Sequence, residues 1–331
     1  MADTAEDETA GKCTEIYRLD NIPTISGLHT IPLRPRVKFA VGYLGCYMNS
    51  NFYHDQLLPL MQGIKVISVS KGSIKNTDIV FPSKIEEQSA IGNFFIHLDA
   101  LITLHQRKCE KLKNIKKSML EKMFPREGEK FPEIRFAGFT DAWEQRKLGD
   151  YLEVSFETNK NNKYSRENVF SVSGEFGVVN QIEFQGRSFA GSSLINYGVV
   201  EKGDVVYTKS PLNSAPYGII KTNKLTPGIV SVLYAVYHPL ANCDSAFVQT
   251  YFEQDARLNN YLRPLISKGA KNTINVSDET ALEGEVLFPS VKEQSAISHF
   301  FSNLDGLIAL HQRKCEKLKN IKKSMLEKMF V

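Results

Sequence analysis

The sequence predicts an α+β protein with two globular domains and two long helices. At 331 residues, the chain is long enough for two domains of about 150 residues each. The 21-residue segment LHQRKCEKLKNIKKSMLEKMF occupies residues 104–124 and returns unchanged at residues 310–330. The text between the two copies is rich in glycine and alternates apolar with polar residues, as strands do. These observations favour one structural unit that is used twice.

The composition is that of an ordinary soluble globular protein, with 42% hydrophobic and 24% charged residues. No apolar run approaches the roughly 20 residues of a membrane span. The acidic start, MADTAEDETAGK, lacks the basic and apolar parts of a secretory signal. The cysteines stand singly, without a C-x-x-C pair, so neither a zinc ribbon nor a redox pair is indicated. We therefore expect a cytoplasmic protein.

The repeat extends beyond the identical segment. Residues 69–103 align with residues 276–309, and both stretches contain the segments FPS and EQSAI. In each copy the pattern predicts a short strand, then a proline that ends it, then a long helix. In the first copy the strand is expected at residues 78–81, and Ser83 is the expected helix cap.

The apolar residues that follow are spaced three and four apart, and no glycine or proline occurs between Gly92 and Pro125. This spacing predicts a helix of about 40 residues, about 60 Å long. A helix of that length cannot bury its apolar stripe against one compact domain, so the second copy is its expected partner. The side chains that we expect at the helix contact or at partner surfaces are Leu98, Leu101, Leu112, Ile115, Met119, Leu304, Leu307, Leu318, Ile321 and Met325.

Histidine and cysteine recur four residues apart on this stripe, as His105 and Cys109 and again as His311 and Cys315. A structural zinc ion needs about four ligands, and each copy offers two. We therefore expect these residues to pack at the edge of the helix contact, and we expect no metal site.

The sequence after the first helix begins with a connector that contains several prolines and glycines. The single tryptophan, Trp143, lies in this connector. A domain of strands follows, and residues 244–263 are predicted to be helical up to Pro264. The first half of the chain resembles a shortened form of this domain, because residues 47–70 align with residues 251–277. The Trp143 region and the first strands of the second domain have no counterpart in the first half. We expect its acidic start to be either a loop of the domain or poorly ordered.

These features together resemble the specificity subunit of a type I restriction–modification enzyme. The resemblance rests on FPS and EQSAI leading into the helix, on the repeated helix text, and on FPEIRFAGFTDAWEQRKLGD before the second domain. It covers nearly the whole chain. It implies two target-recognition domains separated by two long helices packed as an antiparallel coiled coil. The chain departs from the family's pattern in its first domain, where the first strands of a full target-recognition domain have no counterpart.

The resemblance also implies a function and a division of the chain. Such a subunit is not an enzyme: it binds a bipartite double-stranded DNA target and docks two modification (methyltransferase) subunits, with restriction subunits in the full complex. S-adenosylmethionine, ATP and Mg are expected in those partner subunits and no cofactor in this one. The expected parts are a shortened first target-recognition domain (1–82), the first spacer helix (83–124), a connector (125–147), the second target-recognition domain (148–289) and the second spacer helix (290–331).

Candidate DNA-binding side chains are polar and basic residues in the expected loops, because such side chains hydrogen-bond to base edges or to phosphates. The segment 268–273 is the strongest candidate, since its glycine allows close approach of the backbone. The candidates are Lys160, Lys163, Gln185, Arg187, Tyr207, Lys209, Ser210, Asn213, Arg263, Lys268, Lys271 and Asn272, with Lys65 in the first domain.

Other functions stay open at this point. The chain could be a remnant that binds partner subunits without reading a bipartite target, or two chains could pair to read a palindrome. A standalone DNA-cleaving or DNA-methylating enzyme is disfavoured. The sequence has no Asn/Asp-Pro-Pro-aromatic motif, no G-x-x-x-x-G-K-[ST] and no H-E-x-x-H.

Overall fold

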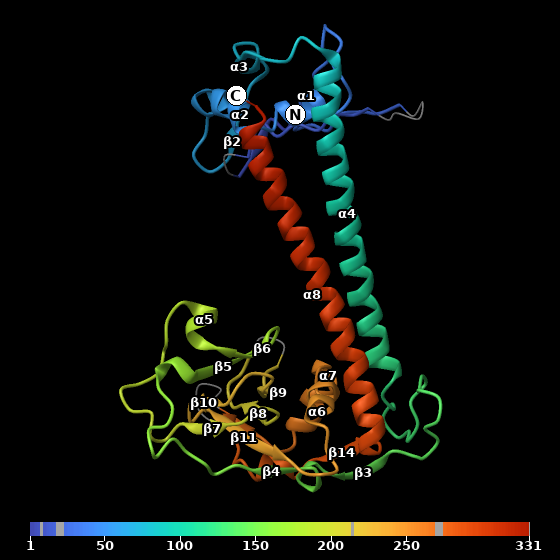
Figure 1. The fold of residues 1–331 in the computed structure, drawn as a ribbon, viewed down its shortest axis with the longest axis vertical. Coiled ribbons are helices and arrows are strands. Elements are labelled where there is room, and N and C mark those ends of the chain that lie inside the picture. Colours follow the sequence, from blue (N-terminus) through green and yellow to red (C-terminus); the bar gives the residue numbers. More distant parts are fainter. Residues whose placement is uncertain (7–8, 18–22, 213–214, 269–273, 331) are drawn as a thin grey trace. The chain divides into compact units, whose positions relative to one another are not determined.

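A computed structural model describes residues 1–6, 9–17, 23–212, 215–268 and 274–330 of the chain (Figure 1). These residues form two compact units. Unit 1 comprises residues 1–112 and 307–331, and unit 2 comprises residues 113–306. Each long helix contributes residues to both units. In the described part of the chain, no helix is long and apolar enough to cross a membrane.

The two long helices are α4 (Ile85–Lys122) and α8 (Val291–Lys328), each of 38 residues. They confirm the helix predicted from the apolar stripe. α8 begins directly after Ser290, whose carbonyl accepts hydrogen bonds from the amides at 293 and 294. The prediction that Ser83 caps α4 is wrong, because the first copy has one more residue between FPS and EQSAI and its helix begins only at Ile85.

A buried glutamine attaches the start of each long helix to its unit. In unit 1, Gln88 Oε1 accepts from the Ala40 amide (3.1 Å) and Gln88 Nε2 donates to the Pro82 carbonyl (2.8 Å). In unit 2, Gln294 at the equivalent position accepts from the Asp244 amide and donates to the Pro289 carbonyl, each at 2.9 Å. The EQSAI segment therefore acts as an anchor, because a buried amide that lost these partners would be left unsatisfied.

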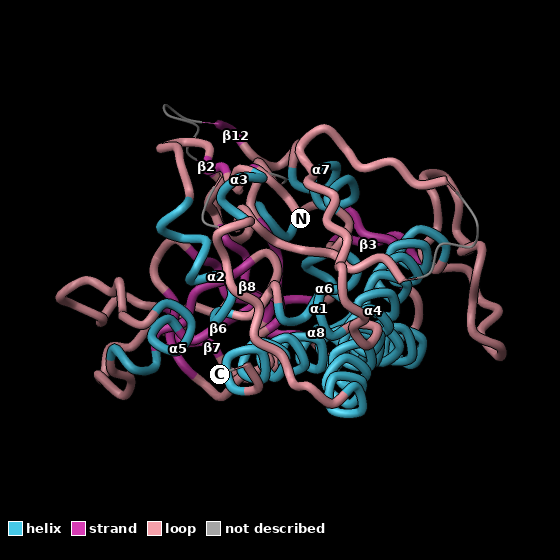
Figure 2. Tube along the Cα trace, turned by 90° about the horizontal axis from the view of Figure 1, so that it is seen from above, coloured by secondary structure: helices cyan, strands magenta, loops and turns pink. Residues whose placement is uncertain are grey.

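Unit 2 is built around two four-stranded sheets, which Figure 2 shows in magenta with connecting loops in pink. Neighbouring strands are antiparallel except β10 and β5, which are parallel. Valines of both sheets share one core with Phe170. One sheet has the order β6 (Gly177–Asn180), β5 (Val169–Ser173), β10 (Gly228–Val230), β7 (Gly198–Val200), and the other β4 (Leu152–Val154), β11 (Tyr234–Pro239), β8 (Val205–Thr208), β9 (Ile219–Thr222).

The segment 244–263 is helical as predicted and consists of two helices, α6 (Ser245–Tyr251) and α7 (Asp255–Leu262). The chain turns between them, and the rings of Phe252 and Tyr261 then lie 4.8 Å apart. Other elements of unit 2 are β3 (Glu144–Lys147), α5 (Gln181–Gln185), β12 (Ser267–Lys268), β13 (Ile274–Asn275), β14 (Glu285–Phe288) and 3-10 turns at Leu148–Asp150, Arg166–Asn168 and Thr280–Leu282.

The described part of the acidic start belongs to unit 1. Met1 is buried and its amine donates to the Ile31 carbonyl (3.2 Å), while residues 4–5 form a strand. The described residues of the start therefore pack within unit 1, while residues 7–8 and 18–22 lie outside the described residues. The elements of unit 1 before α4 are β1 (Thr4–Ala5), α1 (Tyr43–Tyr47), α2 (Asn51–Leu57), a 3-10 turn (Leu58–Leu60), β2 (Ile67–Ser68) and α3 (Lys71–Ile74), and β1 pairs with β2.

The strand predicted before each long helix forms in one unit only. In unit 2 it is β14, which pairs with β3. In unit 1 the prediction of a strand at residues 78–81 is wrong. A strand needs a neighbour, and the first half of the chain has no described segment equivalent to β3.

The phenylalanine that ends the first copy of the repeated segment is buried in an aromatic socket of unit 2. The ring centroid of Phe124 lies 5.8 Å from that of Phe247, 5.9 Å from Tyr251 and 6.2 Å from Phe301. Trp143 covers the socket, with its ring 5.8 Å from Phe124. α4, which begins in unit 1, is thereby fastened at its end within unit 2.

Phe330, which ends the second copy, is buried in the equivalent socket of unit 1. Its ring lies 5.9 Å from Tyr43, 5.7 Å from Tyr47 and 6.0 Å from Phe95. These three residues stand at the positions of the internal repeat that hold Phe247, Tyr251 and Phe301 in unit 2. The two identical helix ends are therefore seated reciprocally, and each long helix is anchored in both units.

Within each unit, segments of α4 and α8 contact each other in antiparallel order. In unit 1, Lys322 donates to Asp99 at 2.6 Å. In unit 2, Lys116 donates to Asp305, which corresponds to Asp99, also at 2.6 Å, and pairs with Glu253. Burial by itself lowers the pKa of Lys116, but the two carboxylates outweigh it and raise the pKa.

Most side chains of the predicted apolar stripe are buried or partly buried, and one repeated position departs from this pattern. Leu98 and Leu304 are buried, and Leu112, Ile115, Met119, Leu318, Ile321 and Met325 are partly buried. Leu101 and Leu307 are instead exposed, and Ile102 and Ile308 are buried next to them. The period of 3.6 residues turns Leu101 and Leu307 off the contact face.

We predict that Phe124→Ala lowers the free energy of unfolding by about 3–5 kcal/mol, because it empties a closed aromatic socket. Chemical denaturation followed by circular dichroism measures the change. Phe131→Ala is the matched control: Phe131 is 53% exposed, so its loss should cost less than about 0.5 kcal/mol. Equal effects of the two substitutions would contradict the seating of Phe124.

Candidate nucleic-acid interface

The loop after β4 carries two exposed lysines on a closed scaffold. The buried Asn159 side chain accepts from the Tyr164 amide (3.0 Å) and donates to the Tyr164 carbonyl (2.9 Å). Lys160 and Lys163 project from this loop into solvent. A hydrogen bond with the Tyr164 side chain raises the pKa of Lys163. The loop thus presents charged amines that phosphates can bind.

A second group of candidates lies on and after α5. Gln181 holds this segment, since its side chain donates to Ser171 Oγ (2.8 Å) and accepts from the Phe189 amide (2.9 Å). Gln185 and Arg187 are exposed, and the Arg187 guanidinium lies 4.6 Å from the centre of the Phe189 ring.

The loop after β4 and the segment after α5 meet at one tyrosine. The Tyr197 carbonyl accepts from the Asn159 amide (3.0 Å), and the Tyr197 hydroxyl accepts from the Gly191 amide (3.2 Å). The structure therefore joins the loops that carry Lys160, Lys163, Gln185 and Arg187 beside the sheet that contains β5 and β6.

Tyr207 is a wrong prediction. It lies in β8 and not in a loop, its side chain is buried, and its hydroxyl donates to the Tyr217 carbonyl at 2.7 Å. Burial raises the pKa of Tyr207. A phenol enclosed in this way cannot reach a base edge, so its role is structural.

A third group of candidates surrounds the hairpin formed by β12 and β13. Lys209 donates to Asp278 Oδ1 at 2.7 Å, and the Asp278 carbonyl accepts from the Tyr237 hydroxyl at 3.1 Å. Ser210 is partly buried and Arg263 is exposed. An open groove of about 530 Å³ beside the hairpin is lined in part by Ser267, Asn275 and Ser277.

The remaining candidates are placed as follows. The segment 269–273, which contains Lys271 and Asn272, lies outside the described residues, as does Asn213. Lys268 lies in β12, where only its backbone is described. Lys65 is exposed, in unit 1, shortly before β2.

Sequence reasoning missed several surface residues that belong to these groups. Arg166 is exposed and donates to the Gly191 carbonyl (3.3 Å), which adds a cation to the group beside β5 and β6. Phe176 and Phe184 are exposed with their rings 5.4 Å apart. The turn GEFG at 174–177 offered a signal, because a phenylalanine at a hairpin tip has no core to enter.

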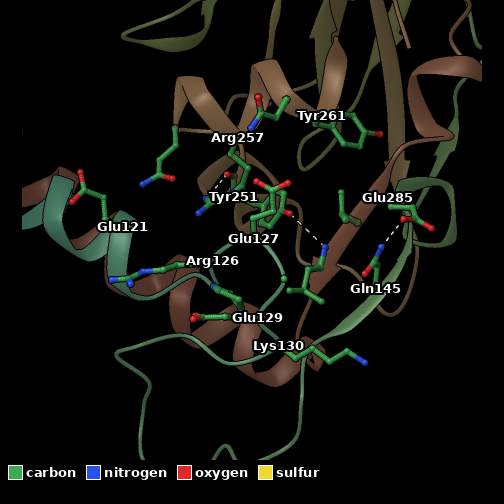
Figure 3. A pocket seen from close by; sticks show the side chains of 16 residues that line it. Glu121, Arg126, Glu127, Glu129, Lys130, Gln145, Tyr251, Arg257, Tyr261 and Glu285 are labelled. Atoms are coloured by element: carbon green, nitrogen blue, oxygen red, sulfur yellow. Dashed lines mark hydrogen bonds between the residues drawn. The ribbon is translucent and has the colours of Figure 1, made fainter. Parts of the chain in front are cut away.

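A pocket of about 660 Å³ elsewhere in unit 2 is a poor candidate for binding phosphate (Figure 3). Its walls carry Glu121, Glu127, Glu129 and Glu285 beside Arg126, Lys130 and Arg257. Arg257 is already engaged: it lies 4.5 Å from the centre of the Phe124 ring and donates to the Tyr251 carbonyl. Among the described residues, no group of three or more His, Cys, Asp or Glu could hold a metal ion.

Residues 140–320 match the family model described as the type I restriction modification DNA specificity domain. The chain belongs to this family. The resemblance drawn from FPS, EQSAI and the repeated helix is thereby confirmed. The specificity-domain match contains every candidate DNA-binding residue except Lys65.

The chain is similar to two known specificity subunits, one compared by sequence and one by structure. The putative type I restriction enzyme MjaX specificity subunit of Methanocaldococcus jannaschii is 22% identical over an alignment 323 residues long, which covers 91% of this chain and 70% of that protein. The crystal structure of the type I restriction-modification system S subunit from M. genitalium matches with a TM-score of 0.56 at 13% identity, over 88% of this chain and 72% of that one. The latter likeness shows a shared fold of mixed α/β content.

We predict that Lys163→Ala lowers the slope of log affinity against log salt by about one for duplex DNA, because one phosphate contact is lost. Tyr207→Phe should leave that slope unchanged and lower the free energy of unfolding by about 1 kcal/mol. Fluorescence anisotropy over a salt series and denaturation measure the two effects. Lys292→Ala, an exposed lysine in the first turn of α8, is the control. A loss of slope in Tyr207→Phe would contradict its structural role.

Proposed function

We propose that this chain is the non-catalytic DNA-reading subunit of a type I restriction–modification complex and binds a bipartite double-stranded target. The observation that carries the proposal is the specificity-domain match across unit 2, whose loops carry basic and polar side chains. Unit 2, residues 148–289 for the most part, would read one half of the target. Residues 1–82 of unit 1 would read the other half.

Within unit 2, the side chains divide by chemistry. Lys160, Lys163 and Arg187 are exposed cations and suit phosphates, which position the protein without reading sequence. Gln185 and Ser210 offer neutral donors and acceptors of the kind that read base edges. We also propose base contacts for Lys271 and Asn272, which lie outside the described residues.

The two long helices would act as a spacer and a docking surface. We propose that α4 and α8 pack as an antiparallel coiled coil that keeps the two readers at a fixed separation. The antiparallel contacts within each unit support this. Exposed leucines recur at equivalent positions, Leu101 and Leu104 on α4 and Leu307 and Leu310 on α8. Two equivalent apolar patches suit two identical modification subunits.

The chemistry would lie in the partner subunits. Methyl transfer from S-adenosylmethionine would belong to the modification subunits, and ATP use and Mg-dependent cleavage to the restriction subunits. The complex would act in the cytoplasm, where the chromosome is accessible. This chain would supply recognition and assembly, which need no catalytic group.

The proposal predicts the pattern of DNA methylation when the chain is co-expressed with its modification subunit. Genome-wide methylation mapping should show one bipartite motif with a gap of fixed length. A palindrome built from one half-site would instead indicate two chains that each read with unit 2. The absence of any motif, with the complex intact, would contradict the reading function.

We further predict that Leu101→Glu combined with Leu307→Glu weakens binding of the modification subunit at least tenfold, because it charges two exposed apolar patches. Size-exclusion chromatography and titration of the purified subunits measure this. Gln106→Glu combined with Gln312→Glu adds the same charge at exposed, equivalent positions of the same helices and should bind normally. Docking on the helices would be refuted if both double variants bound equally well.

A further inference from the structure

Residues 78–81 of unit 1 align with β14 of unit 2, and alternate residues of this segment make its described main-chain hydrogen bonds. The Asp78 amide donates to Gln56 Oε1 (2.9 Å), and the Val80 amide donates to the Tyr47 hydroxyl (2.9 Å). The intervening Ile79 and the following Phe81 make no main-chain hydrogen bond to any described residue. Because alternate residues of an extended chain face opposite edges, the outer edge carries unused donors and acceptors.

The equivalent segment of unit 2, β14, shows the same inner edge and a covered outer edge. The Leu287 amide donates to the Tyr251 hydroxyl (3.4 Å), as Val80 does to Tyr47. The outer edge pairs with β3, which places Val286 opposite Arg146 and Phe288 opposite Glu144. The covering strand therefore contacts the positions that correspond to Ile79 and Phe81.

The side chains record the same difference. Val286 is 1% and Phe288 0% exposed in unit 2, whereas Ile79 is 39% and Phe81 42% exposed in unit 1. An apolar strand with a free edge is a surface that another strand can extend. Unit 1 thus exposes what unit 2 buries.

The carboxylate of Glu87, at the start of α4, indicates what kind of segment could bind beside residues 78–81. In unit 2, Glu293 is buried and accepts two hydrogen bonds of 2.7 Å from Arg135, which precedes β3 in the connector. The equivalent Glu87 of unit 1 is exposed and has no ion-pair partner among the described residues. A segment that carries an arginine ahead of its strand would match both the edge and this carboxylate.

The aromatic part of the site, by contrast, is already closed. Phe39 lies against Tyr43 (6.2 Å between ring centroids) and Phe81 (4.9 Å). In unit 2 the residue equivalent to Tyr43 is Phe247, which Trp143 covers at 6.0 Å. Compared with unit 2, the surface formed by residues 78–81 and Glu87 therefore lacks a pairing strand and a cation. It does not lack an aromatic side chain, because Phe39 already covers Tyr43.

We propose that the outer edge of residues 78–81, together with Glu87, binds an extended segment of another polypeptide as an antiparallel strand. The occupant has the chemistry of residues 131–150 of this chain: an arginine for Glu87 and a polar strand for Ile79 and Phe81. Strand addition of this kind derives affinity from main-chain hydrogen bonds. It supplies unit 1 with the strand that unit 2 already has, and it is independent of DNA reading.

The test uses the full chain and a fluorescein-labelled peptide of residues 131–150, followed by fluorescence anisotropy. One peptide should bind per chain. Glu87→Arg should weaken binding at least tenfold, and a peptide with Arg135→Glu should restore it to that variant. Glu86→Arg, at the neighbouring exposed position of the same turn, should bind the original peptide normally.

Two further peptides separate a strand from a docked side chain. Methylation of the backbone nitrogen at Arg146 should abolish binding, because this residue would face Ile79, whereas methylation at Gln145 should be tolerated. Equal tolerance of both would overturn the strand. Binding that is insensitive to Glu87→Arg but lost in Glu293→Gln would place the peptide in unit 2 and likewise overturn the proposal.

Discussion

The reciprocal seating of two identical phenylalanines is the constraint on which the rest of the structure depends. Phe124 follows the last turn of α4 and is buried against Phe301 of α8, while Phe330 follows the last turn of α8 and is buried against Phe95 of α4. Each helix end is thus held beside the other helix's start. The antiparallel order within each unit follows from this exchange.

The starts of the two long helices are held differently: at each start, a buried glutamine side chain forms hydrogen bonds to the main chain of its own unit. Gln88 and Gln294 do the same work at equivalent positions. The units then diverge around this shared anchor. In unit 2 the neighbouring Glu293 is buried by Arg135 and β14 is covered by β3, whereas in unit 1 Glu87 and residues 78–81 are exposed. The repeated sequence therefore accounts for the glutamine anchor that both units have. The connector, which contains Arg135 and β3, accounts for the burial of Glu293 and β14 in unit 2.

The candidate site was partly predictable from residue type. Lys160, Lys163, Gln185 and Arg187 are exposed as expected, because long polar side chains outside an apolar pattern seldom enter a core. Tyr207 was misread, since the text YTKS looks like a polar loop although the tyrosine ends inside a sheet. Which loops meet could not be predicted either. Tyr197 joins two of them through its carbonyl, which accepts from the Asn159 amide 38 residues earlier in the sequence, and local patterns carry no information on such a pair.

The sequence by itself determined the long helices, the doubled unit and the family, because helical periodicity and a repeated text are local properties that survive without coordinates. It also indicated that the first half of the given sequence contains no counterpart of the Trp143 region. Only the tertiary structure decided that residues 78–81 are not a strand, that residues 244–263 are two helices, and that Ile102 and Ile308 rather than Leu101 and Leu307 are buried. The physical reason is common to all three. Strand pairing, helix breaks and the facing side of a stripe depend on the neighbour that covers them, and that neighbour is distant in sequence.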